Sequence, residues 1–168
     1  MGSDSKILFV ALIRQNQGIV NSLCRLYATS HEEMKDYRQD VLLSLWRAYP
    51  HFKEESKVST WMYRVALNTL ISIQRKKKHV ILTEPISESF ENNHFQHAGS
   101  DDNLLVLQQA IGYLKPMDKA VVILYLEGYD NREMAKMLSI SETNVSTKLN
   151  RIKTQLKKTV KTLQDEFK

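Results

Sequence analysis

Apolar residues recur at three- and four-residue steps through most of this 168-residue chain, which is the period of an amphipathic helix. In the first half the pattern predicts three helices, at about residues 6–27, 32–49 and 59–78. Pro50 ends the second, and a Ser-Thr pair is expected to cap the third. The first helix, which begins with an apolar run, is expected in the core. The apolar stripe expected on the third consists of Met62, Val65, Ala66, Thr69, Leu70 and Ile73.

The second half predicts four more helices, of which the last two form a recognisable pair. Two helices are expected first, at about residues 103–114 and 117–127. A short helix at 131–138 then leads through a three-residue turn into a long basic helix, with Ser141 as its cap. Short helix, turn and long helix form the helix-turn-helix pattern. Ser139 occupies the turn position where glycine is common.

Residues 79–102 have little helical periodicity and contain Pro85, Gly99 and six Ser, Thr or Asp residues, which predicts a linker. The predicted fold class is therefore all-α, with two small helical domains joined by a flexible linker. The second is expected to be a helix-turn-helix domain of the winged-helix-like, DNA-binding kind. The boundaries follow the pattern: a first domain at 1–80, an acidic linker at 81–102 and a second domain at 103–168.

Charge is distributed in a basic, acidic, basic order that favours a nucleic-acid partner. The net charge is +5 and the isoelectric point about 9.2, a modest excess. Residues 75–78 are all basic and the last helix is rich in Lys, whereas 80–102 contains acidic residues and no Lys or Arg. Cys24 is the chain's single cysteine, which fits a reducing compartment.

The third predicted helix combines the side chains that bind opened DNA. Trp61, Arg64 and Asn68 are expected largely off its apolar stripe, followed by Arg75 and Lys76. Aromatic rings stack on unpaired bases, cations follow the phosphates, and an Asn amide pairs with a base edge. The alternative is that the aromatic residues belong to the core and the cations complement the helix dipole.

Two other helices carry candidate binding faces. On the second helix a mixed polar face with an exposed leucine indicates a protein interface, although a solvated surface gives the same pattern. In the helix-turn-helix the first turns of the long helix would face the major groove. The residues placed there are Thr143, Asn144, Thr147, Lys148 and Arg151.

Three segments, residues 36–46, 59–68 and 114–156, resemble in order and spacing the extracytoplasmic-function group of bacterial sigma factors, within the sigma-70 family. The resemblance implies that the first docks on the beta-prime clamp of core RNA polymerase and that the second captures melted minus-ten DNA. The third would read minus-thirty-five promoter DNA beside the beta flap. Asn68 matches a family position that contacts a flipped base, in a pocket shared with the loop at about 52–59. The resemblance also implies a restraining anti-sigma factor, which in this family is often membrane-bound.

The resemblance assigns roles to three sets of residues, each taken from the matching segment. The polymerase-binding set is Asp36, Gln39, Asp40, Leu43 and Arg47. The minus-ten set is Lys57, Trp61, Arg64, Asn68, Arg75, Lys76 and Lys77. The minus-thirty-five set is Thr143, Asn144, Ser146, Thr147, Lys148 and Arg151, where Ser146 and Lys148 replace a stretch that is often richer in arginine.

Competing functions fit the sequence less well. A conventional helix-turn-helix regulator would carry an upstream domain with strands, but the first 80 residues predict helices only. An enzyme is suggested only by His94 and His97, near Glu88 and Glu91, and these lack a second ligand pair. We therefore expect no catalytic residue, metal or cofactor. No apolar stretch has the length of a membrane span, so a cytoplasmic protein is expected.

Overall fold

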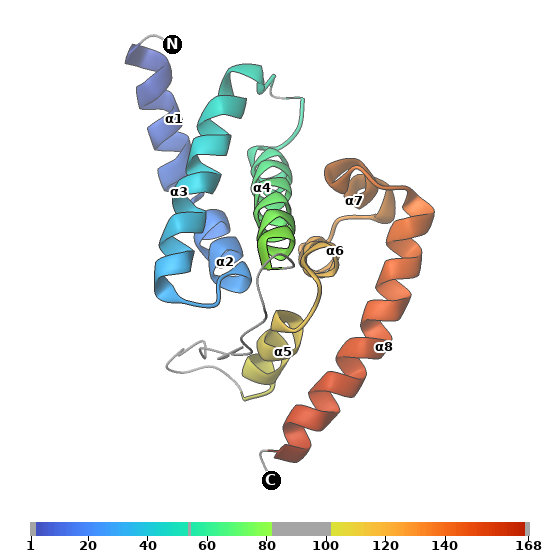
Figure 1. Cartoon of the computed structure of the whole chain (residues 1–168). Coiled ribbons are helices and arrows are strands. Elements are labelled where there is room, and N and C mark those ends of the chain that lie inside the picture. The colour runs from blue at the N-terminus through green and yellow to red at the C-terminus, as the bar shows by residue number, and fades with distance from the viewer. Residues whose placement is uncertain (1–2, 54, 82–101, 167–168) are drawn as a thin grey trace. The chain divides into compact units, whose positions relative to one another are not determined.

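The computed structural model describes residues 3–53, 55–81 and 102–166, which form eight α-helices and one short 3-10 helix (Figure 1). The chain divides into two compact units, Met1–Ser89 and Phe90–Lys168. This arrangement confirms the predicted all-α class with two helical bodies. The proposed linker falls mainly outside the described residues, as do His94 and His97, and the exact domain boundaries stay a prediction. No helix in the described ranges has the length and apolar character needed to span a membrane.

The first unit is built on three mutually packed helices, α2 (Gln17–Tyr27), α3 (His31–Ala48) and α4 (Val58–Ile81). Ser30 caps α3 by accepting a hydrogen bond from the Glu33 amide at 3.1 Å, and α3 passes into the 3-10 turn Tyr49–His51 at Pro50. The largest fully buried side chains come from all three helices. They are Val20, Leu23, Tyr27, Tyr37, Val41, Leu45, Met62, Leu67 and Leu70.

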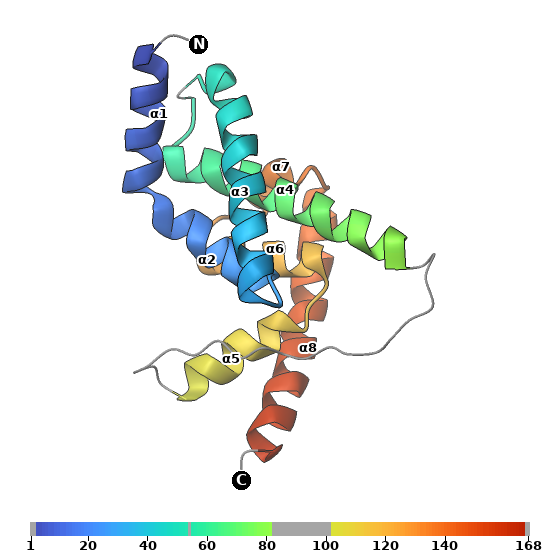
Figure 2. The same cartoon turned by 60° about the vertical axis from the view of Figure 1, so that its left-hand side comes forward.

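The single first helix predicted from the sequence is wrong, because the chain breaks between α1 (Ser3–Gln15) and α2, and the two run in different directions (Figure 2). Asn16 adopts φ −117° and ψ 16°, and its side-chain amide donates to the Leu12 carbonyl at 2.9 Å, which satisfies a carbonyl at the helix end. The placement of α1 in the core is also mostly wrong. Phe9 is buried, packing edge-on against the Trp46 ring with 5.0 Å between centroids, while its neighbours Ile7, Leu8 and Val10 are exposed.

The helix α4 begins earlier than predicted, so the two residues expected to cap it lie within its first turn. The helix begins at Val58, and the Trp61 amide donates to the Lys57 carbonyl at 3.1 Å. Ser59 and Thr60 therefore lie inside the first turn instead of capping it.

The buried face of α4 is also rotated from the expected stripe. Met62, Ala66 and Leu70 are buried as expected, but the neighbouring row Tyr63, Leu67 and Ile71 is buried with them. The expected Val65, Thr69 and Ile73 are only half-buried, which leaves their side of the helix accessible.

The second unit contains α5 (Asp102–Gly112), α6 (Pro116–Leu126), α7 (Asn131–Leu138) and α8 (Glu142–Glu166). The amino-terminal part of α8 packs on α6 and α7, and α5 packs on its later turns through Val106, Ala110 and Leu163. Helices and turns make up the described part of this unit. The helix-turn-helix is thus confirmed, while no strand that could form a wing occurs within residues 102–166.

The turn between α7 and α8 has the predicted geometry. Ser139, at the turn position where glycine is common, adopts the left-handed conformation with φ 55°, and the Ile140 amide closes the turn on the Ala135 carbonyl at 3.0 Å. Ser141 caps α8 by accepting from the Asn144 amide at 3.1 Å, as predicted. These bonds fix the angle at which α8 leaves α7.

Candidate nucleic-acid interface

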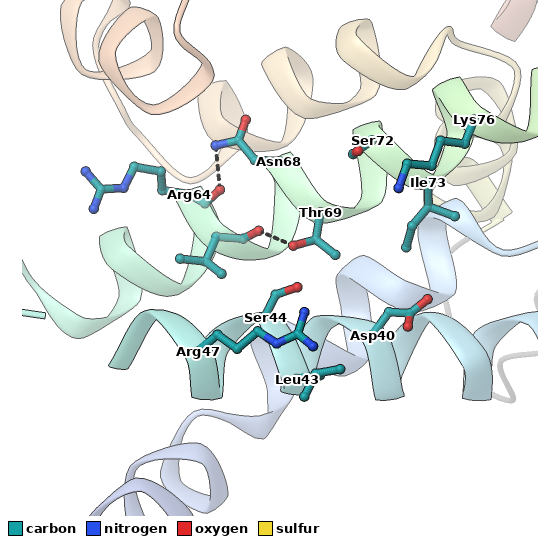
Figure 3. A pocket seen from close by; sticks show the side chains of 11 residues that line it. Asp40, Leu43, Ser44, Arg47, Arg64, Asn68, Thr69, Ser72, Ile73 and Lys76 are labelled. Carbon is teal, nitrogen blue, oxygen red and sulfur yellow. Dashed lines mark hydrogen bonds between the residues drawn. The ribbon is translucent and has the colours of Figure 1, made fainter. Parts of the chain in front are cut away.

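A shallow groove of about 600 Å³ runs between α3 and α4 and joins two of the predicted binding sets (Figure 3). Three residues of the polymerase-binding set line it from α3, namely Asp40, Leu43 and Arg47. Three of the minus-ten set line it from α4, namely Arg64, Asn68 and Lys76. The sequence assigned these sets to different segments of the chain, and the structure brings half of their members around one hollow.

The groove exists because α4 leaves one of its apolar rows uncovered. Half-buried Val65, Thr69 and Ile73 line it, and Thr69 and Ile73 point from α4 toward α3 in Figure 3. The Thr69 hydroxyl donates to the Val65 carbonyl at 2.8 Å, so part of its hydrogen-bonding capacity is used within the helix. Apolar surface flanked by polar side chains is typical of a binding groove.

Positive charge exceeds negative charge along the groove. The three cationic groups of Arg47, Arg64 and Lys76 accompany the carboxylate of Asp40. The Asn68 side-chain amide donates to the Arg64 carbonyl at 2.8 Å, which orients its amide plane on the helix surface. Cations, an oriented amide and small hydroxyl groups together suit an unpaired nucleic-acid strand, whose phosphates and base edges present acceptors and donors.

Two groove residues were missed by the sequence reasoning. Ser44 of α3 and Ser72 of α4 line the hollow, and each adds a hydroxyl group. No signal in the sequence separates these serines from others on exposed helix faces. Their position becomes visible only when the two helices are packed together.

The remaining polymerase-binding residues confirm the predicted outward face of α3. Asp36 and Gln39 are exposed, as are Asp40 and Arg47 in the groove, and Leu43 keeps 44% of its surface accessible. The apolar pattern predicts an inner face of Val41, Leu42, Leu45 and Tyr49, of which Val41 and Leu45 are fully buried and the other two half-buried. The exposed leucine among charged side chains remains a feature of an interface.

Trp61 does not have the exposed ring that the sequence reasoning expected. Only 3% of its surface is accessible, and its ring stacks on Phe52 with 4.8 Å between centroids and lies 6.4 Å from the Tyr49 ring. The rings are part of the aromatic core, which was the open alternative. Trp61 therefore supports the loop at the start of α4 and is unsuited to stacking on a base.

Lys77 is also placed differently from the prediction, because a carboxylate already neutralises it. Its ammonium contacts Glu33 of α3 and donates to the Tyr37 hydroxyl at 3.0 Å. The Tyr37 hydroxyl donates to Glu33 at 2.6 Å, and Gln74 donates to Tyr37 at 2.9 Å. The Glu33 carboxylate offsets the charge of Lys77 and so weakens its attraction to a phosphate, and we assign this lysine to helix packing.

The cluster around Glu33 perturbs three ionisable groups. Burial alone would raise the pKa of Glu33, but hydrogen bonds from Lys77, Tyr37 and Thr29 lower it to about 2. Burial and the Glu33 carboxylate raise the pKa of Tyr37 to about 12. The pKa of Lys77 is raised, since its hydrogen bonds to Glu33 and Tyr37 outweigh burial. At neutral pH the cluster is an ion pair that joins α3 to the later turns of α4.

The other minus-ten cations are accessible. Lys57, at the start of α4, and Arg75, near its end, are exposed and lie outside the groove. Lys76 is exposed beside it. Lys77 is exposed as well, but it differs from these cations in its ion pair with Glu33.

In the second unit the predicted minus-thirty-five residues share the start of α8. Thr143, Asn144, Ser146 and Thr147 are exposed, while Val145, Leu149 and Ile152 pack on the rest of the unit. Lys148 and Arg151 pair with a carboxylate from α6, Asp118, which the sequence reasoning had not singled out. Arg151 keeps 58% of its side chain exposed, compared with 19% for Lys148.

Comparisons with known proteins agree with both units. The pattern of Sigma-70 region 2 matches residues 12–80, and that of Sigma-70, region 4 matches residues 104–156. The chain is 26% identical over 151 residues to the ECF RNA polymerase sigma factor SigM of Mycobacterium tuberculosis, covering 88% of this chain and 74% of the relative. It is 27% identical over 157 residues to the RNA polymerase sigma factor YlaC of Bacillus subtilis, covering 89% and 90%.

Two solved structures share the fold. The sigma factor RpoE, in complex with the anti-sigma factor NepR from Bartonella quintana, matches with a TM-score of 0.70 and 19% identity over 95% of this chain and 98% of that one. CnrH, in complex with the cytosolic domain of CnrY, matches with a TM-score of 0.62 and 18% identity over 94% and 90%. With both sigma regions matched in order, the chain belongs to the extracytoplasmic-function group of the sigma-70 family, the transcription initiation factors that direct RNA polymerase to promoters.

Proposed function

We propose that α3 of the first unit binds core RNA polymerase, that α4 captures melted minus-ten DNA, and that α8 of the second unit reads minus-thirty-five DNA. The groove between α3 and α4 is the observation that carries this proposal, because it gathers residues of both the polymerase-binding and the minus-ten sets. A DNA strand held there would lie directly beside the polymerase surface that binds α3. Recognition and capture would then depend on assembly with the polymerase.

The chemistry of the groove supports an unpaired strand over a duplex. Its apolar lining from Val65 and Ile73 suits a base face, and its cations suit phosphates. Asn68 supplies an oriented amide at the edge, which suits a base edge. Extruding a base costs a few kcal/mol, which such contacts can offset. We leave Trp61 and Lys77 out of the proposed minus-ten surface. It retains Arg64, Asn68 and Lys76 in the groove and Lys57 and Arg75 outside it.

The proposed partners follow from the family and from the exposed faces. On the polymerase side they are the beta-prime clamp, which α3 would contact, and the beta flap, beside which the second unit would sit. The complex of the structural neighbour RpoE with an anti-sigma factor supports a comparable inhibitor here, of the kind that is often membrane-bound in this family. We place the protein in the cytoplasm, where its polymerase partner acts. The functional domains would be residues 1–80 and 103–168, joined by the acidic linker.

Run-off transcription tests the proposal directly. Purified bacterial core polymerase is incubated with a pool of promoter fragments, with and without the full chain. Initiation that requires the chain, at sites sharing two spaced sequence elements, is the expected result. Failure of the chain to bind core polymerase, together with DNA binding that needs no polymerase, would contradict the proposal and favour a conventional helix-turn-helix regulator.

A pair of α3 variants separates polymerase binding from folding. Leu43→Arg changes an exposed side chain in the groove, so it should weaken polymerase binding without changing the thermal unfolding temperature. Arg38→Ala is the matched control, because Arg38 is exposed on the same helix but about 140° around it from Leu43. Equal polymerase affinity for the two variants would place the interface elsewhere.

A further inference from the structure

Asp118 is a buried carboxylate to which neither the sequence reasoning nor the proposed function gives a role. Only 3% of its surface is accessible, and it stands at the third position of α6, after Lys115 and Pro116. The amino-terminal end of a helix favours a negative charge. A charge that is nearly fully buried is retained in a fold only when paired, and both of its partners come from α8.

Each oxygen of Asp118 binds a different cation of α8. Oδ1 accepts from the Lys148 ammonium at 2.9 Å, and Oδ2 accepts from Nη2 of Arg151 at 3.0 Å. The two cations are three residues apart, so they project from the same side of α8. Asp118 thus ties the start of α6 to the part of α8 that carries the proposed DNA-reading residues.

The two cations differ in what the pairing leaves accessible. The Lys148 side chain is 19% exposed, so its ammonium acts mainly as the counter-ion of Asp118. The Arg151 side chain is 58% exposed, and this bond uses one of the five N–H groups of its guanidinium. Arg151 also lies on the same helical face as Asn144 and Thr147, which are seven and four residues earlier and exposed. The ion pair with Asp118 therefore holds the accessible guanidinium of Arg151 beside the exposed side chains of Asn144 and Thr147.

We propose that Asp118 is a positioning residue for promoter recognition, which anchors Arg151 on the DNA-facing side of α8 and withholds Lys148 from the phosphates. The inference rests on the proposed function of α8. An anchored guanidinium binds with little loss of side-chain entropy, which favours the correct sequence. A withheld lysine removes one charge that would attract any DNA. Asp118 raises the ratio of specific to non-specific affinity by both routes.

The test uses holoenzyme assembled from bacterial core polymerase and the full chain. Its affinity is measured for a promoter duplex recovered by the run-off experiment and for a shuffled duplex of equal length and composition, over a series of salt concentrations. Asp118→Asn should bind the shuffled duplex several-fold more tightly, with a salt slope steeper by about one. Its ratio of specific to shuffled affinity should fall about tenfold, the size expected for one lost base-pair contact.

Asp165→Asn is the matched control, because Asp165 is an exposed acid near the far end of α8 and its replacement adds the same unit of charge. It should leave the affinity ratio unchanged. A purely structural role for Asp118 would lower both affinities together, in step with the thermal unfolding temperature, and that result would overturn the inference. An unchanged ratio in Asp118→Asn would overturn it as well.

A second variant keeps the inference testable if Asp118→Asn does not fold. Arg151→Lys preserves the charge but removes the planar fork that Asp118 anchors, so discrimination should fall with no gain in affinity for the shuffled duplex. Full discrimination by Arg151→Lys would overturn the inference. Wild-type holoenzyme that binds both duplexes equally would instead overturn the proposed function, and with it the role of Asp118.

Discussion

The ion pair between Glu33 and Lys77 gives the sharpest quantitative prediction, which concerns the stability of the first unit. The pKa of Glu33 is lowered from its ordinary 4.5 to about 2 by hydrogen bonds from Lys77, Tyr37 and Thr29, which outweigh the effect of burial. A shift of this size corresponds to at most ~3 kcal/mol. Because half of the Lys77 side chain is exposed, solvent screening reduces the contribution to about 1–2 kcal/mol. Glu33→Gln should lower the free energy of unfolding by that amount at pH 7.

The dependence on pH follows from the direction of the shift. A carboxyl group with a lowered pKa in the folded protein stabilises it fully above its unfolded value, and this contribution is lost as the pH falls toward the folded value. The stability difference between wild type and Glu33→Gln should therefore be constant near neutrality. It should narrow as the pH falls from about 4.5 toward about 2, since wild-type Glu33 then takes up a proton.

Tryptophan fluorescence can follow this unit within the full chain. The two tryptophans of the sequence, Trp46 and Trp61, both lie in the first unit, so urea unfolding monitored by their emission reports that unit alone. Glu32→Gln is the control, because Glu32 is exposed and its ion-pair partner within the described residues is Lys35, three residues away at 3.2 Å. It should change stability by less than about 0.5 kcal/mol. A Glu33→Gln effect that is equally small, or that persists unchanged at pH 3, would refute the reasoning.

Four further predictions concern the DNA-binding parts and the core. Trp61→Ala should lower the free energy of unfolding in urea by about 3–5 kcal/mol, as removal of a buried aromatic side chain does. Unchanged stability would mean that the ring is not part of the core and is available to contact DNA. Asn68→Ala should weaken minus-ten base discrimination in transcription assays and leave polymerase binding intact; unchanged base preference would remove Asn68 from the site. Lys76→Ala should reduce the salt slope of promoter binding by about one if Lys76 contacts a phosphate, while Lys77→Ala should leave that slope unchanged. Ser139→Gly should stabilise the second unit by about 0.5–1 kcal/mol in thermal unfolding followed by circular dichroism, because Ser139 has φ 55°, and a loss of stability would contradict this account.

The sequence predicted where most helices begin and end, because local residues decide those points. Pro50 turns the end of α3 into a 3-10 segment and Pro116 opens α6, because proline has a fixed φ and no N–H group, and Ser141 caps α8 through a bond to the amide three residues later. The break at Asn16 was missed because an asparagine inside an apolar periodicity is compatible with an unbroken helix. Only its backbone angles and its bond to Leu12 reveal the end of α1.

The groove was harder to predict because α4 is apolar on more than one side. Met62, Ala66 and Leu70 form a central row, with the apolar residues Tyr63 and Leu67 on one side of it and Val65 and Ile73 on the other. Periodicity alone gives no preference between the two flanking rows. The packing of α2 and α3 buries the first and leaves the second along the groove. The candidate site therefore depends on the packing of three helices.

The roles of individual cations were also hard to predict, because ion pairing depends on carboxylates that are distant in the sequence. Lys76 and Lys77 are adjacent in the sequence, and Lys148 and Arg151 are one turn apart, so no local pattern distinguishes a lysine that is accessible to phosphates from one that is neutralised. The deciding carboxylates lie far away along the chain, 44 residues from Lys77 and 30 from Lys148. Each pairing removes one cation from the DNA surface and joins two helices of the same unit. The cations near the proposed DNA surfaces thus have two separate roles, and Lys77 and Lys148 should not contribute to the salt slope of promoter binding.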